Sequence, residues 1–222
     1  MGSIESAERA LQTPRAAGVT GILCAVVLGA AILLIRNAVP NDPAGDPTAW
    51  VLNLVPFAGI FFLQYMATVR SYIGAAEDKF FSTLFLGSGV LFVAALFVSA
   101  SVASSLQTDV SHATSESWQS GRDLTLAMLV SYSMRMASVF TLITTTIGQK
   151  VGIFPRWLAG LGYLVGLYLM FVASGVPWSE FVFPVWILVV GVYVLVTTLR
   201  PQQAQASPST RGDSAPGDDV RP

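Results

Sequence analysis

The stretch from Leu124 to Ile147 constrains the fold most, because it is almost wholly apolar and long enough to cross a lipid bilayer. About 20 predominantly apolar residues suffice for a membrane-spanning helix. Near its middle lies Arg135, the only formal charge deep inside any apolar block of this chain. Such a charge costs roughly 2.5–3.5 kcal/mol on insertion scales and usually faces protein or trapped water. We therefore expect Arg135 to face other helices or water, and it is the strongest functional candidate.

Composition indicates an integral membrane protein. Of the 222 residues, 53% are hydrophobic and only 11% are charged, whereas soluble domains carry about 25% charged residues. The net charge is −1 and no basic block is present, so nucleic acid is not an expected partner. The expected partner is the lipid bilayer.

Six apolar blocks predict an all-α, polytopic membrane helix bundle with six transmembrane helices. The blocks lie at about 17–38, 50–69, 81–104, 124–147, 157–174 and 179–199, within one membrane domain over residues 17–200. Residues 1–16 form a polar N-terminal segment. Residues 201–222 are almost free of apolar side chains, and we predict a disordered cytoplasmic tail.

The distribution of positive charge predicts the orientation, since Lys and Arg are concentrated in cytoplasmic loops. With six spans, both termini and the second and fourth loops share one side, which holds Arg9, Arg15, Arg70, Lys79, Lys150, Arg156, Arg200, Arg211 and Arg221. The other side holds only Arg36 and Arg122. Both termini are therefore predicted to be cytoplasmic, in a bacterial inner membrane.

Three runs resemble a group of bacterial six-span membrane proteins to which no activity is assigned. These are LVPFAGIFFLQYMATVRSYIGAAEDKFFSTLFLGSG (54–89), YSMRMASVF (132–140) and GIFPRWLAGLGY (152–163). The resemblance covers most of the membrane region and none of the tail. It implies a compact six-helix membrane fold and carries over no functional residue.

No catalytic, cofactor or metal site is predicted. The single histidine, His112, lies in the polar connection 106–123, whereas haem in a membrane bundle usually needs paired histidines within spans. The single cysteine, Cys24, lies inside the first apolar block. Serines within the spans have no histidine, lysine or carboxylate at comparable depth to act as a base. We therefore expect a protein that is not an enzyme.

Two interpretations of Arg135 remain open. In the first, it fixes helix packing through backbone carbonyls, Tyr132 and Asn53. In the second, it contacts an anionic ligand or ion. Glu180, near the outer end of the sixth span, is the nearest acid by depth, and Gln64 is a further polar candidate within a span.

Two further features indicate contacts rather than chemistry. Gly162 and Gly166 are spaced four residues apart in the fifth span, a pattern that permits close helix packing in lipid. The cytoplasmic loop carries Arg70, Glu77 and Asp78, which either pair with one another at the interface or dock a partner protein.

The leading functional prediction is a non-enzymatic membrane protein with a structural, accessory or partner-binding role, through another membrane protein or self-association. The alternative is a small secondary transporter or channel for an anionic solute, with Arg135 as the counter-charge within the membrane. The two functions predict different surroundings for Arg135: a transporter requires a polar cavity that reaches this residue, whereas a structural or partner-binding protein does not.

Overall fold

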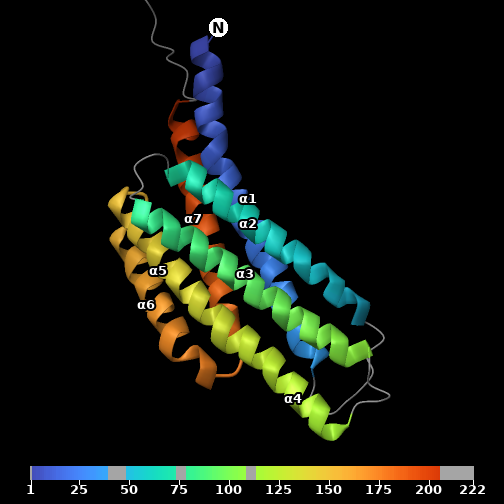
Figure 1. The fold of residues 1–222 in the computed structure, drawn as a ribbon. Coiled ribbons are helices and arrows are strands. Elements are labelled where there is room, and N and C mark those ends of the chain that lie inside the picture. The colour runs from blue at the N-terminus through green and yellow to red at the C-terminus, as the bar shows by residue number, and fades with distance from the viewer. Residues whose placement is uncertain (1, 40–48, 74–78, 109–113, 206–222) are drawn as a thin grey trace, which may run out of the picture.

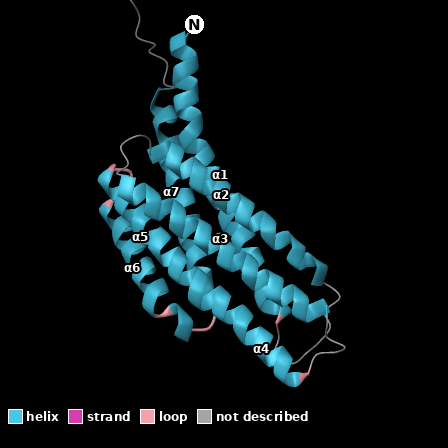
Figure 2. Ribbon diagram, viewed as in Figure 1, coloured by secondary structure: helices cyan, strands magenta, loops and turns pink. Residues whose placement is uncertain are grey.

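Every regular element is a helix in the computed structural model, which describes residues 2–39, 49–73, 79–108 and 114–205 (Figures 1 and 2). Helices suit an apolar chain because backbone groups in lipid must be hydrogen-bonded internally. The longer helices are α1 (Gly2–Ala38), α2 (Val55–Ile73), α3 (Lys79–Thr108), α4 (Ser115–Leu126), α5 (Met134–Lys150), α6 (Arg156–Phe171) and α7 (Val182–Gln205). Short turns of 3₁₀-helix form η1 (Ala49–Leu54), η4 (Ala173–Gly175) and η5 (Ser179–Phe181), and η3 (Ala127–Ser133) is a π-helix. The prediction of an all-α bundle is confirmed for these residues.

Among the residues that the structure describes, five helical segments are long and apolar enough to cross a membrane. They cover Gly18–Ala38, Leu52–Arg70, Phe80–Gln107, Glu116–Lys150 and Ser179–Thr198. The predicted fifth span is shorter than expected, because α6 ends at Phe171 and has 16 residues. At 1.5 Å per residue it measures about 24 Å, less than the roughly 30 Å of a typical hydrocarbon core.

The predicted polar connection 106–123 is helical over most of its described residues. α3 continues to Thr108, and α4 begins at Ser115 after Thr114, whose side chain accepts a hydrogen bond of 3.2 Å from the Ser117 amide. A threonine in this position satisfies one of the unpaired amides of a helix start. α4, η3 and α5 then run as one helix to Lys150, so the Arg135 span begins earlier than predicted.

The helices pack in pairs with small residues between them. α1 and α7 lie side by side, with Gly191 so close to α1 that an added Cβ atom would stand 3.0 Å from the amide nitrogen of Ile22. α1 begins and α7 ends at the same end of the bundle (Figure 1). α5 turns into α6 through Gly152, whose φ of 76° requires the left-handed backbone that glycine adopts without strain.

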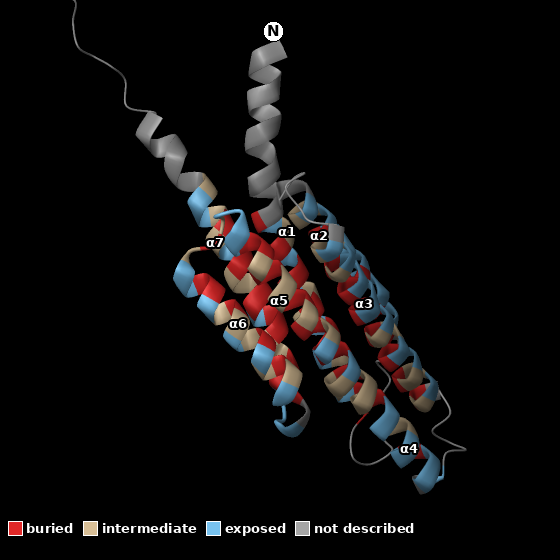
Figure 3. Ribbon diagram, turned by 60° about the vertical axis from the view of Figure 1, so that its left-hand side comes forward, coloured by how far each residue is buried: buried red, intermediate tan, exposed pale blue. Residues whose placement is uncertain are grey.

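Aromatic rings from four helices form the centre of the core. The ring centroid of Phe62 on α2 lies 4.9 Å from that of Phe92 on α3 and 5.2 Å from that of Phe140 on α5. Phe183 on α7 lies 5.0 Å from Phe92. Figure 3 shows this buried interior, with exposed residues on the outward faces of the helices. The core therefore ties α2, α3, α5 and α7 together.

Candidate functional site

An ion pair joins the end of α1 to the start of the last helical segment. The guanidinium of Arg36 donates a hydrogen bond to Oε1 of Glu180, which lies on η5. The Glu180 side chain is fully buried, whereas that of Arg36 is 23% exposed. The second carboxylate oxygen of Glu180 has no hydrogen-bond partner within the described residues. Arg36, which is partly exposed, therefore neutralises the charge of a fully buried acid.

Trp178 holds Arg36 from a second direction. The guanidinium carbon lies 4.5 Å from the centre of the Trp178 ring, a distance at which a cation is attracted to the aromatic face. Trp178 has φ 66° and ψ 8° and is the only non-glycine residue with positive φ in the described chain. A bulky residue in this region is strained, and such strain is concentrated at functional sites.

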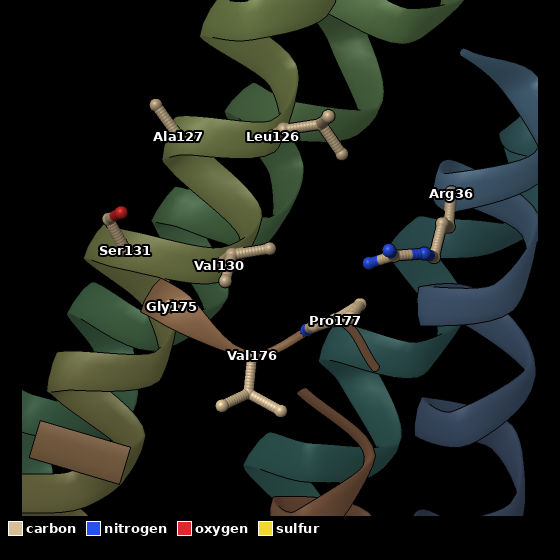
Figure 4. Close-up of a pocket in the computed structure, with 8 residues that line it drawn as sticks. All are labelled: Arg36, Leu126, Ala127, Val130, Ser131, Gly175, Val176 and Pro177. Carbon is tan, nitrogen blue, oxygen red and sulfur yellow. The ribbon is translucent and has the colours of Figure 1, made fainter. Parts of the chain in front are cut away.

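A cavity of about 310 Å³ lies in front of Arg36. Figure 4 shows the guanidinium extending toward Val130 of η3, with Val176 and Pro177 on the neighbouring connection. Most of the lining side chains are apolar, although polar and apolar atoms contribute about equally to the lining surface. The lining residues are Arg36, Leu126, Ala127, Val130, Ser131, Gly175, Val176 and Pro177. The site therefore combines one cation with a lining of mixed polarity, in which most side chains are apolar.

The wall of this cavity is the π-helix itself. Single π-helical turns inside α-helices are rare and are frequently found at functional sites. Within η3 the Ser133 hydroxyl bonds back to the carbonyl of Leu129, a side-chain bond that competes with the regular helical pattern. A strained tryptophan and a π-helix thus border the same site, which marks it as the candidate functional site.

The arrangement offers hydrogen-bond donors to an oxyanion. Arginine carries five N–H donors in a planar fork, and Arg36 makes one hydrogen bond within the described part of the chain. No group of three or more His, Cys, Asp or Glu residues that could hold a metal ion occurs among the described residues.

Arg135 lies on the outer surface of α5 and not in the interior. It makes no hydrogen bond or ion pair within the described ranges. This differs from the expectation that it faces other helices or trapped water. Tyr132, one turn earlier, is also 55% exposed. The sequence shows that α5 contains a charge but does not fix which face carries it, because the inner face of this helix is polar too, with Ser138 and Thr141 fully buried.

Glu180 pairs with Arg36 and is not brought to Arg135. The sequence singles out Glu180 but not Arg36 or Trp178, because charged and aromatic residues at the ends of apolar blocks are typical of the membrane interface. The available signal was the acid itself, because a carboxylate at the end of an apolar span needs a cation, and Arg36 is the cation at the corresponding end of the first span.

The other polar residues singled out in the sequence do not lie together at one site. Asn53 is exposed on η1 and lines a separate cavity of about 460 Å³ between η1, α2 and α3. Gln64 is exposed on α2, where its backbone carbonyl accepts a hydrogen bond of 2.8 Å from Thr68. Arg70 is exposed near the end of α2. Glu77 and Asp78 lie outside the described residues, so the loop with Arg70 is not placed.

The structure places Gly162 and Gly166 in the contact between α6 and α5. A Cβ atom added at Gly162 would stand 2.2 Å from Oγ1 of Thr145, and one at Gly166 would stand 2.5 Å from a methyl carbon of Leu142. Ser138 also donates a hydrogen bond of 2.7 Å to the Gly166 carbonyl. Close approach of the two backbones permits this bond.

Comparisons with known proteins provide no further identification: no protein-family model, no curated protein and no solved structure matches the chain. The resemblance to bacterial six-span membrane proteins stays a prediction from the sequence.

Proposed function

We propose that this chain is a six-span inner-membrane protein that acts by binding another membrane-spanning chain through the exposed face of α5. The observation that carries the proposal is Arg135, a charged side chain on the outer surface of an apolar helix with no partner in the described part of its own chain.

Six spans and cytoplasmic termini are the topology that fits this proposal. α6 then crosses despite its 16 residues, because a short apolar helix is accommodated by local thinning of the bilayer. The start of α1 and the end of α7 lie at one end of the bundle (Figure 1), consistent with an even number of crossings. The bias of Lys and Arg toward that end supports its assignment to the cytoplasm.

The depth of Arg135 makes its exposure costly. The stretch between Asp123 and Lys150 carries no other charge. For any placement of a 30 Å core between these two ends, the Arg135 α-carbon lies roughly 8 Å or more inside both edges of the core. Charges at such depth are normally paired or face protein and water. A second chain that covers Arg135 removes the cost of facing lipid.

Charge complementarity identifies the partner as a transmembrane helix that carries an aspartate or glutamate at the matching depth. A carboxylate accepts two parallel hydrogen bonds from a guanidinium, which adds geometric specificity to the charge attraction. A second copy of this chain fits less well, because a two-fold contact through this face brings Arg135 toward its own equivalent. Arg135 lines neither the 310 Å³ nor the 460 Å³ cavity of the described residues, so neither cavity supports transport of an anionic solute through Arg135.

A designed helix tests the proposal with the purified full chain in lipid nanodiscs. The probe is a leucine-rich transmembrane peptide with one central glutamate, and its control carries alanine at that position. Energy transfer between labels on the peptide and on the chain measures binding. We expect the glutamate peptide to bind at least about ten times more tightly, a difference of about 1.4 kcal/mol.

Variants of the chain then decide whether Arg135 is responsible. Arg135→Met should abolish the preference for glutamate, and Arg135→Lys should keep part of it, because lysine retains the charge without the planar fork. Lys150→Met, which removes a charge at the end of the same helix, should change nothing. Equal binding of the two peptides, or a preference that survives Arg135→Met, would refute the proposal.

A further inference from the structure

The cavity in front of Arg36 carries an inference that does not rest on the proposed function. Arg135 does not line it, although Ser131, one turn before Arg135, does. Its cation is already held in place by Glu180 and by the Trp178 ring. Both supports are independent of any ligand.

The unused donors of Arg36 identify the polar part of a ligand. Glu180 takes one hydrogen bond from the guanidinium, and Figure 4 shows the side chain projecting from α1 toward the cavity. N–H donors without acceptors favour a carboxylate or phosphate oxygen, which they bind in a planar, two-point contact. A cationic ligand is disfavoured, because Arg36 is the only charged residue among the described residues that line the cavity.

The apolar side chains in the lining indicate what the rest of the ligand is. Leu126, Val130, Val176 and Pro177 offer no hydrogen-bonding side chain, and Ser131 is the one uncharged polar side chain in the lining. Glu180 already balances the charge of Arg36, so a small inorganic anion gains little from this site alone. An apolar chain attached to the anion adds a contribution of roughly 0.8 kcal/mol for each buried methylene.

The volume limits how much of the ligand enters. A cavity of about 310 Å³ lies at the lower end of the range for small-molecule sites, which is roughly 300–1,000 Å³. It accommodates an anionic group and the first part of a chain, with the remainder of the chain outside. From these observations we infer that the Arg36 cavity binds the oxyanion end of an amphiphile, with the guanidinium on the oxyanion and the chain against η3, Val176 and Pro177.

Binding of four ten-carbon amphiphiles tests the inference on the purified full chain in phosphatidylcholine nanodiscs. Decanoate and decyl phosphate carry an oxyanion, whereas decanol and decyltrimethylammonium carry the same chain without one. We expect saturable binding of the first two, at least about tenfold tighter than binding of the others. Equal binding of decanol would show that only the chain is recognised and would overturn the inference.

A cavity-filling variant keeps the test independent of the ion pair. Gly175 lines the cavity, and a Cβ atom added there meets no other atom within 4 Å. Gly175→Leu should therefore fold normally and weaken decanoate binding at least about tenfold. Gly160→Leu is the matched control, since Gly160 on α6 is equally open and lies outside the cavity lining. Arg36→Lys, which keeps the charge beside Glu180, should also weaken binding. Decanoate binding unchanged in Gly175→Leu would refute the site.

Two sources supply such an oxyanion, and a lipid-exchange experiment distinguishes them. If the site holds a membrane lipid, nanodiscs with phosphatidylglycerol should yield a chain that retains this lipid after detergent extraction, and decanoate should displace it. If the ligand is a free amphiphile, decanoate should bind without any enrichment of phosphatidylglycerol. Either result supports the inference, provided that Gly175→Leu abolishes the binding of the lipid or of decanoate.

Discussion

Arg36 and Glu180 stand 144 positions apart in the chain, yet their side chains form a partly buried ion pair that joins the end of α1 to the start of the last helical segment. The two partners are not equivalent. Glu180 is fully buried, whereas Arg36 retains contact with the cavity and with the exposed Trp178 ring. Loss of one partner therefore has a different consequence from loss of the other.

The first prediction follows from this asymmetry. Arg36→Met leaves Glu180 buried without a cation and should lower the free energy of unfolding by about 3 kcal/mol. Glu180→Gln leaves Arg36 partly exposed and should cost about 1 kcal/mol. Chemical unfolding in detergent measures both values. The double variant Arg36→Met/Glu180→Met should recover much of the larger loss, and a loss as large as that of Arg36→Met alone would contradict this account.

The second prediction concerns the backbone at Trp178. Replacement by alanine and by glycine removes the ring equally, but only glycine adopts the observed φ of 66° without a steric penalty. Trp178→Gly should therefore be more stable than Trp178→Ala by about 1 kcal/mol. Thermal unfolding of the two variants side by side provides the measurement. Equal stability would mean that the left-handed conformation stores no strain.

The third prediction compares glycines on one helix. Gly162→Leu/Gly166→Leu places side chains against Thr145 and Leu142 of α5, where a Cβ atom alone is already too close. We expect a loss of about 3 kcal/mol or more, comparable with severe overpacking. Gly160→Leu on the same helix meets open space and should leave stability unchanged. If the double variant is as stable as the parent, α6 does not pack on α5 in the membrane.

The all-helical fold was predictable from the sequence because its cause is local. Apolar blocks such as Leu124–Ile147 leave the backbone no partner except itself in lipid. Helix ends were less predictable, since polar residues such as Ser115 and Arg122 extend a helix beyond the apolar block without changing the apolar pattern. α6 shows the reverse case: the helix ends at Phe171 although the sequence that follows is still apolar.

The site was harder to predict because it depends on contacts between distant segments. Arg36 and Glu180 each looked like an interface charge, and only the packing of α1 against α7 brings them together. The π-helix has no residue that marks it, because Ala127–Ser133 contains neither proline nor glycine. The exposure of Arg135 could not be predicted for a different reason. α5 carries polar side chains on both faces, so periodicity alone did not show which one faces outward.

The fourth prediction tests the orientation of the chain. Ser120 on α4 is exposed, and with six spans it lies outside the cytoplasm. A cysteine introduced there should react with a membrane-impermeant thiol reagent added to intact cells, whereas a reporter fused after Leu199 should be active only in the cytoplasm. The native Cys24 is fully buried, so background labelling should be low. Labelling of the introduced cysteine only in inverted membrane vesicles would reverse the topology.

The last prediction separates a packing role of Arg135 from a partner-binding role. If Arg135 fixed the helices of its own chain, Arg135→Lys and Arg135→Met would both lose donors that the fold requires, and both would be less stable. In the structure Arg135 is exposed and has no partner among the described residues, so we expect the free energy of unfolding of both variants of the isolated chain to lie within about 0.5 kcal/mol of that of the parent.

In native membranes we expect the two variants to differ from the parent in partner binding. A photo-crosslinking residue at Tyr132, on the same exposed face, should give one discrete adduct with another protein, and Arg135→Met should remove that adduct while Arg135→Lys retains part of it. The same crosslinking residue at Val185, on the exposed face of α7, should give none. A loss of more than about 1 kcal/mol in the isolated Met variant, or an adduct at Tyr132 that is indifferent to Arg135, would return this arginine to a role within its own bundle.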